Sequence, residues 1–252
     1  MDTTAGGASS ALGPRPESHG GAPPGRRAEP RTPASLVATG GPAREGTTDV
    51  RGNVGGKAMS RLDLTRRLVA QLTHGEIVVA GIGNANFDLY AAGPRPENFY
   101  MLGSMSLAVP IALGVALAQR SRKVFAIEGD GSLLMNLGAL ATVAMVAPDN
   151  LTVIVWDNGA YQITGGQAAA TAEATDLVAV ARGAGIAQSG WARDEAEFER
   201  LVRDSLTGHG PRFIGARVNR EPGAGRPERD PVLVKDRFMR GIGAKPAQPG
   251  SG

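Results

Sequence analysis

The stretch Gly129-Asp130-Gly131-Ser132, with Asn158 28 residues after Asp130, is the most informative feature of this chain. A short apolar run at 123–128 leads into the stretch and is typical of a buried strand. A second apolar run, at 151–156, leads to Asn158. We expect the two runs to be parallel strands whose carboxyl ends meet at one edge of a sheet, which is where open α/β folds bind ligands.

The residue types at this edge suit a metal-bound diphosphate. Asp130 supplies a carboxylate, Asn158 supplies a neutral amide oxygen, and the backbone carbonyl of Ala160 is a third candidate ligand. Mg²⁺ prefers such oxygen ligands and is usually held by one or two protein groups together with phosphate oxygens. Gly129 and Gly131 allow a tight turn and let a phosphate approach the backbone closely. The sequence therefore predicts a magnesium and diphosphate site here.

Strands and helices alternate along the rest of the chain, which predicts a mainly parallel sheet covered on both faces, a three-layer α/β/α fold. A helix that begins at Ser132 would direct its free N–H groups and positive dipole end at the anion. We expect strands at 76–80, 123–128, 151–156, 186–188 and 212–218, and helices at 61–72, 105–119, 132–147, 176–183, 194–205 and from 230 onward, with a short helical turn at 87–90 and an irregular segment at 159–171.

The motif and its spacing resemble those of the diphosphate-binding (C-terminal) domain of thiamine-diphosphate (ThDP) enzymes, in which Gly-Asp-Gly is followed by Asn. The resemblance covers about 61–241. Within the family the chain looks most like the beta subunit of sulfopyruvate decarboxylase and the matching half of phosphonopyruvate decarboxylase, through residues 81–90, 98–105 and 164–167. This resemblance implies a 2-oxoacid decarboxylase, a carboxy-lyase, with ThDP and Mg²⁺ as cofactors.

The resemblance also implies roles around the metal motif. Met105 would be wedged between the two rings of the cofactor, and the carbonyl of Gly103 would accept a hydrogen bond from the 4′-amino group, which places that nitrogen for proton transfer. The alternative is that Met105 belongs to the core. Ser106 stands where the family usually has Gly, which puts full activity in question. The remaining cofactor contacts would be Gly129, Asp130, Gly131, Ser132, Asn158, Ala160 and Tyr161, of which Tyr161 could instead merely pack beside the site.

Four polar residues are candidates for binding the substrate. Asn84 and Asn86 follow the first expected strand at the same sheet edge, and Thr164 and Gln167 lie in a Gly-rich loop after Asn158. The alternatives are ordinary, because Asn often stabilises turns through its own backbone and a polar loop needs no ligand.

The two ends of the chain differ in composition from its middle. Residues 1–57 are rich in Gly, Pro, Ala, Thr and Arg, and such a segment buries too little apolar surface to offset its ordering entropy. It also lacks the apolar core of a secretory signal. We expect a disordered extension at 1–57, one domain at 58–242 and a disordered tail at 243–252. The alternative reading of the extension is that Met59 is the physiological start.

Charge and cysteine content exclude several classes. The net charge is +3, and residues 1–57, with seven Lys/Arg and five Asp/Glu, account for +2 of it. The domain is therefore nearly neutral, which argues against a nucleic-acid partner. No apolar run reaches the roughly 18 residues of a membrane helix. The chain has no cysteine, which excludes disulfides and cysteine-ligated iron–sulfur clusters in it and is compatible with the cytoplasm, where we expect it.

A partner follows from the resemblance. In this family the glutamate that protonates the aminopyrimidine lies on a separate pyrimidine-binding domain, and no segment here resembles that domain. The resemblance therefore implies a pyrimidine-binding (alpha-type) subunit in a hetero-oligomer, with sulfopyruvate or phosphonopyruvate as the small 2-oxo acid substrate. Two alternatives stay open: the ThDP subunit of a 2-oxoacid oxidoreductase, and a non-catalytic regulatory subunit with the same fold.

Overall fold

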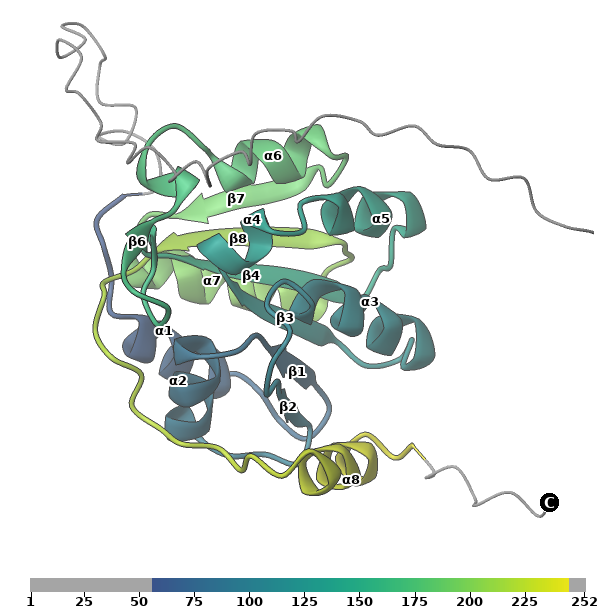
Figure 1. The fold of residues 1–252 in the computed structure, drawn as a ribbon. Helices are drawn as coiled ribbons and strands as arrows, with labels where there is room; N and C mark the ends of the chain where they lie inside the picture. Colours follow the sequence, from purple (N-terminus) through teal and green to yellow (C-terminus); the bar gives the residue numbers. More distant parts are fainter. Residues whose placement is uncertain (1–55, 245–252) are drawn as a thin grey trace, which may run out of the picture. The chain divides into compact units, whose positions relative to one another are not determined.

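The computed structural model describes residues 56–244 (Figure 1). Nearly all of the expected extension and the tail from residue 245 therefore lie outside the described residues. Within 56–244 a parallel sheet has the strand order β2-β1-β3-β4-β8-β7. Its strands are β1 (Ile77–Ala80), β2 (Asn98–Tyr100), β3 (Val124–Gly129), β4 (Leu151–Asp157), β7 (Gln188–Ala192) and β8 (Arg212–Arg217).

Helices pack on both faces of this sheet, so the expected three-layer α/β/α fold is confirmed (Figure 1). One face carries α3 (Ala108–Ala118), α4 (Asp130–Leu134), α5 (Gly138–Val146), α6 (Leu177–Gly183) and α8 (Pro231–Gly241). The other carries α1 (Arg61–Val69), α2 (Asn84–Ala92) and α7 (Glu195–Thr207).

The central strands β1, β3 and β4 are mainly apolar because the sheet is buried on both sides. In β3, Val124 and Ala126 pack into the core under α3, whereas Phe125 and Ile127 pack into the core under α1 and α7. Burial of each large side chain of this kind contributes on the order of 1.5–3 kcal/mol. The sheet is thereby packed between two helical layers, and the carboxyl ends of its parallel strands lie at one edge.

Helix starts follow local capping chemistry. The side chains of Ser60, Asp176, Asp194 and Asp230 each accept a hydrogen bond from a backbone N–H in the first turn of the helix that they precede. Such caps satisfy N–H groups that have no partner within the helix. The expected starts of α1, α6, α7 and α8 are confirmed within one residue, although α1 ends at Val69 rather than at 72.

Two expected helices differ from the structure. The single helix at 132–147 is in fact two, the five-residue α4 and the nine-residue α5, with a turn between them. The helix expected from Met105 begins at Ala108, because Ser104 and Ser106 have φ of 61° and 75°, outside the right-handed helical region.

The remaining differences concern short elements. The helical turn expected at 87–90 is part of the nine-residue helix α2. The short strand expected at 186–188 lies further along the chain, as β7 at Gln188–Ala192. Strand β2 was not predicted, because three residues without alternation leave no pattern. The segment expected to be irregular contains a small antiparallel hairpin, β5 (Ala160–Tyr161) with β6 (Gln167–Ala168).

Candidate functional site

A pocket of about 260 Å³ lies at the carboxyl edge of the sheet. The chain leaves β1 outward to β2, while β3 lies on the opposite side of β1, so the strand order reverses there. Such a switch point is where open α/β sheets bind ligands. The pocket is lined mainly by the connections that follow β1, β3 and β4: residues 82–85, 129–132 and 158–164.

The Gly-Asp-Gly turn forms one wall of this pocket. A Cβ added to Gly129 would meet no atom within 4 Å, so the wall leaves open space there. A Cβ added to Gly131 would lie 2.6 Å from Cε1 of Tyr161, so this position admits only glycine without moving that ring. The turn is therefore open where a diphosphate would approach and closed where the aromatic ring supports it.

Asp130 is a buried carboxylate on the pocket wall. It is only 2% exposed, and one of its oxygens accepts a hydrogen bond from the hydroxyl of Thr171. Asp157, also buried, lies close enough that its pKa is raised, first by burial and then by the charge of Asp130. Arg217 opposes this through an ion pair 2.7 Å long whose N–H is not aligned for a hydrogen bond. This pair of carboxylates would be stabilised by a further cation at Asp130.

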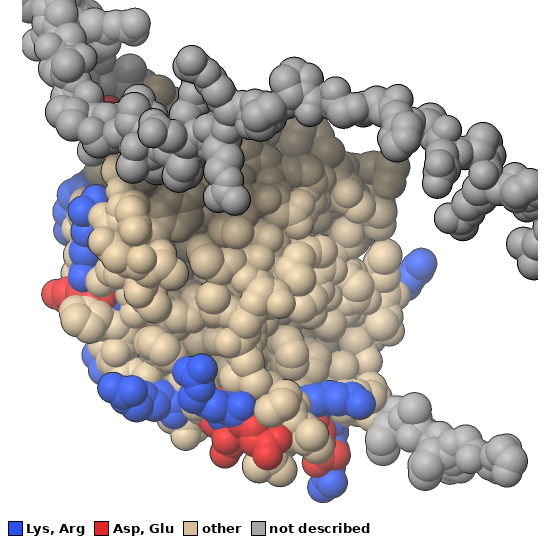
Figure 2. All heavy atoms as spheres, in the orientation of Figure 1, with Lys and Arg blue, Asp and Glu red and all other residues tan. Residues whose placement is uncertain are grey.

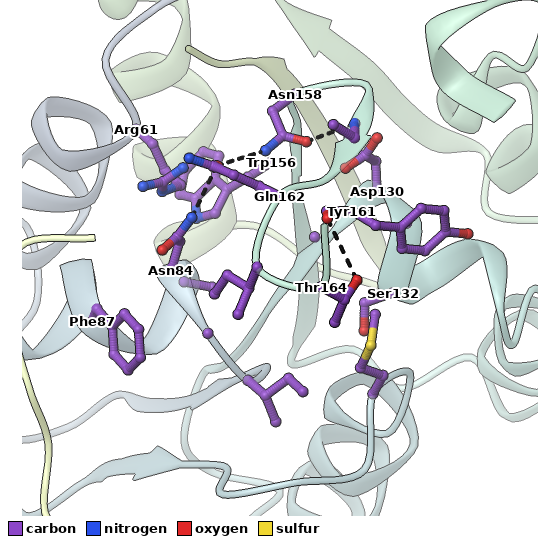
Figure 3. Close-up of a pocket in the computed structure, with 18 of the residues that line it drawn as sticks. Arg61, Asn84, Phe87, Asp130, Ser132, Trp156, Asn158, Tyr161, Gln162 and Thr164 are labelled. Carbon is purple, nitrogen blue, oxygen red and sulfur yellow. Dashed lines mark hydrogen bonds between the residues drawn. The ribbon is translucent and has the colours of Figure 1, made fainter. Parts of the chain in front are cut away.

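Asn158 faces the same pocket from the turn after β4 (Figure 3). Its Oδ1 accepts a hydrogen bond from the N–H of Ala160 at 2.9 Å, and Gly159 between them has φ of 65°, which favours glycine. No cluster of three His, Cys, Asp or Glu side chains that could hold a metal occurs within 56–244. The donor set of Asp130, Asn158 and Ala160 thus fits an ion such as Mg²⁺ that takes its other ligands from phosphate and water.

The loop before α3 contributes Met105 to the pocket wall. Gly103 is exposed and lies between two pocket-lining residues, Leu102 and Met105. Ser106 donates its backbone N–H to the Ser132 hydroxyl at 2.7 Å. The loop after β2 is thereby joined to the start of α4, and the left-handed backbone at Ser106 is held in place.

Replacing Ser106 with glycine is expected to stabilise the fold. The left-handed conformation costs a non-glycine residue about 1–2 kcal/mol, while the added freedom of glycine in the unfolded chain costs about 0.5–1 kcal/mol. The backbone hydrogen bond to Ser132 is kept. We expect a rise in Tm of roughly 2–4 °C by calorimetry. In the matched control, Ser121→Gly in an exposed turn with ordinary φ, Tm should not rise; equal shifts in both variants would contradict the assignment of strain to Ser106.

The four expected substrate residues differ in their position relative to the pocket. Asn84 and Thr164 line the pocket, but Asn86 and Gln167 do not. Asn86 is buried and donates its amide to the backbone carbonyl of Met101, and Gln167 is exposed on the hairpin. Asn84 is already engaged through both ends of its amide, with Gln162 and with the N–H of Gly223. Of the four, Asn84 and Thr164 stay candidate substrate contacts, and the Thr164 hydroxyl donates to the Tyr161 carbonyl at 3.4 Å.

Several contacts at the site could not be anticipated from the sequence. The Thr171 hydroxyl donates a hydrogen bond to Asp130, and the charge of Asp130 helps to raise the pKa of Asp157. The side chain of Gln162 accepts hydrogen bonds from both Asn84 and Asn158. Glu128 precedes the motif, accepts the N–H of Ala108 at 3.1 Å and has its pKa raised to about 7 by burial. Except for the contact of Gln162 with Asn158, these hydrogen bonds join residues at least 20 positions apart. Only Glu128 and Asp157, which stand next to motif residues, could be noticed in the sequence.

Residues 81–216, which include every part of the pocket wall named above, match the family described as thiamine pyrophosphate enzyme, C-terminal TPP binding domain. The chain belongs to this family. The expected ThDP-binding domain is thereby confirmed at the level of the family, over more than half of the chain.

Two relatives of this ThDP-family chain are named as decarboxylases. It is 38% identical over 183 residues to sulfopyruvate decarboxylase subunit beta of Methanocaldococcus jannaschii, a match that covers 72% of this chain and 96% of that protein. It is 36% identical over 190 residues to phosphonopyruvate decarboxylase of Streptomyces viridochromogenes, covering 75% of this chain and 47% of the relative. The chain thus spans nearly all of the first protein and about half of the second.

A solved structure shows the same fold. Benzoylformate decarboxylase from Polynucleobacter necessarius superposes with a TM-score of 0.56 and 18% identity, over 65% of this chain and 34% of that one. At this identity the likeness concerns the fold alone. Among the helices of residues 56–244, none is long and apolar enough to cross a membrane.

Proposed function

We propose that this ThDP-family chain is the ThDP- and Mg²⁺-binding subunit of a 2-oxoacid decarboxylase that acts on sulfopyruvate or phosphonopyruvate. The observation that carries the proposal is that Asp130 and Asn158 line one pocket, beside Gly129, which leaves room for a diphosphate (Figure 3). The named decarboxylases among the relatives support the reaction class.

In this proposal the residues of the chain bind and orient. Asp130, Asn158 and the carbonyl of Ala160 hold Mg²⁺, and the glycine-lined wall at Gly129 admits the diphosphate. Met105 supports the cofactor rings from the opposite wall. When bound, ThDP supplies an electron sink for the electrons that a 2-oxo acid releases with CO₂. The protein's own part is thus to place the cofactor and keep its reacting end at the pocket mouth.

A pyrimidine-binding partner subunit completes the site in this proposal. Among the described residues that line the pocket, Asp130 is the only carboxylate, and it is committed to the metal. In this proposal the glutamate that protonates the aminopyrimidine comes from the partner subunit. The name of the first relative, subunit beta, supports an assembly of unlike subunits.

The surface beside the pocket suits such a partner. Residues 101–119 and 131–148 contain no Lys, Arg, Asp or Glu, and they form α3, α4 and α5 with their flanking turns. Figure 2 shows an uncharged surface over these helices. We call this surface the uncharged face; its exposed large side chains are Leu107 (38%), Leu117 (41%), Met135 (60%), Met145 (79%) and Val146 (37%).

The uncharged face is continuous with the pocket, which is why we assign it to the partner that completes the pocket. Helix α4 begins at Asp130, and α3 follows the loop that carries Met105. A subunit seated on α3 and α4 would thus reach the open side of the cofactor site. Contiguous exposed apolar surface of this kind marks interaction sites in soluble proteins.

The substrate assignment is tested with the reconstituted pair. Both proposed substrates carry an acidic head group, and Arg229, an exposed residue that lines the pocket, supplies positive charge for it. We expect ThDP-dependent release of CO₂ from sulfopyruvate or phosphonopyruvate, and turnover of pyruvate lower by at least about tenfold, because the head-group contact is lost. Equal turnover of pyruvate would contradict the assignment.

We place the pair in the cytoplasm, a proposal that rests on the cysteine-free sequence alone.

A further inference from the structure

Gln162, on the hairpin that overhangs the pocket, is the centre of a hydrogen-bond network that ties three segments together (Figure 3). Its Oε1 accepts the amide N–H of Asn84 at 2.9 Å and that of Asn158 at 3.1 Å. Its Nε2 donates to the backbone carbonyls of Arg220 and Glu221. One side chain thus joins the start of α2, the turn after β4 and the segment after β8.

These contacts define which way the Asn158 amide points. Nδ2 of Asn158 donates to Gln162, while Oδ1 accepts from the N–H of Ala160 at 2.9 Å. Rotating the amide by half a turn would set two donors against each other at Ala160 and two acceptors against each other at Gln162. Only one orientation satisfies both neighbours, and in it the oxygen points to the side of the pocket where Asp130 lies (Figure 3).

The backbone of the same turn is held from the other side by Arg220. Its Nε donates to the carbonyl of Asn158 at 2.9 Å and its Nη2 donates to that of Gly159 at 3.3 Å. The carbonyl of Arg220 in turn accepts from Gln162. Side chain and backbone of the turn are therefore fixed by two neighbours that also bond each other.

We propose that Gln162 is a positioning residue for the metal: it holds the amide of Asn158 so that the oxygen, and not the NH₂ group, faces the cation. The inference rests on the proposed function, since it requires Asn158 to be a metal ligand. Outer-shell partners that orient metal ligands typically account for a 10–100-fold difference in metal affinity. Gln162 is itself held in place by Asn84, 78 residues away in the sequence, and by the carbonyl of Arg220, 58 residues away.

The test is the affinity of the full-length chain for Mn²⁺ in saturating ThDP, measured by calorimetry or by electron paramagnetic resonance. Gln162→Met keeps the side-chain length but removes acceptor and donor, so we expect Mn²⁺ to bind about tenfold more weakly. The control is Gln188→Met at the start of β7, whose amide donates only to the carbonyl of His209 at 3.0 Å and is remote from the pocket. That variant should bind Mn²⁺ like the wild type.

A second background separates orientation from general damage to the hairpin. In Asn158→Asp the ligand has an oxygen at both positions, so its rotation no longer matters. Adding Gln162→Met to Asn158→Asp removes the acceptor that then faces a carboxylate oxygen, so it should not weaken Mn²⁺ binding, and a double-mutant cycle measures this coupling.

The outcomes distinguish the two levels of the proposal. A wild-type chain that binds no Mn²⁺ with ThDP would overturn the proposed function and this inference with it. Wild-type binding with an unchanged affinity in Gln162→Met would overturn the inference alone. The same would follow if the tenfold loss persisted in the Asn158→Asp background, because Gln162 would then merely support the hairpin.

Discussion

Replacing Asp130 with alanine is expected to abolish the Mg²⁺-dependent binding of ThDP while the fold stays intact. Asp130 is the only carboxylate among the described residues that line the pocket, and the other proposed ligands, Asn158 and the Ala160 carbonyl, are neutral. Losing a ligand should cost more than the 10–100-fold typical of outer-shell changes, so we expect affinity to fall by more than about 100-fold. The measurement is a calorimetric titration of the reconstituted pair with ThDP and Mg²⁺.

Two further variants make this result interpretable. Asp130→Asn removes the charge but keeps an oxygen for the Thr171 hydroxyl, and it should also lose binding. In the absence of metal Asp130→Asn should not lower Tm, because the charge of Asp130 raises the pKa of Asp157 and its removal relieves that repulsion. Asp236→Asn breaks only a surface ion pair with Arg240 on α8 and should bind normally. ThDP affinity unchanged in both Asp130 variants would sink the metal assignment.

The isolated chain is expected to release no CO₂ from sulfopyruvate or phosphonopyruvate, and to do so once a pyrimidine-binding subunit is added. The chain spans 96% of a relative named as a subunit beta, and its described pocket wall holds no glutamate. Proton transfer by a positioned group is typically worth 10²–10⁴-fold in rate. We therefore expect at least a ~100-fold gain on mixing, measured as CO₂ release. Closing the cleft would also exclude water from the reacting end of the cofactor.

The uncharged face supplies a matched pair of variants for the same assay. Met145→Lys places a charge where the partner would seat, and burying it unpaired is costly, so activation should need at least about tenfold more partner. Val232→Lys, at a 70% exposed position on α8 outside that face, should behave like the wild type. Both changes are at exposed positions and should leave Tm unchanged. Robust turnover by the purified chain alone would refute the split site, and equal activation of both variants would move the partner to another surface.

Features that depend on residues close together in the sequence could be predicted from the sequence alone. The apolar runs at 123–128 and 151–156 are strands because both sides of them are buried, and the caps at Ser60, Asp176, Asp194 and Asp230 act within a single turn. The Gly-Asp-Gly turn and Asn158 were placed at one sheet edge on the same grounds, since parallel strands end together.

Other features have no pattern in the local sequence and depend on the tertiary structure. The three residues of β2 are a strand because they pair with β1, the helix expected at 132–147 breaks into α4 and α5, and Gln162 acquires its partners 4, 58 and 78 residues away. Local propensity is summed over neighbours along the chain, whereas these features depend on groups that meet only when the sheet has formed. The residue types and spacing of the chain therefore predicted a metal and diphosphate site at this sheet edge, and only the folded neighbours of Asn158 determined the orientation of its amide.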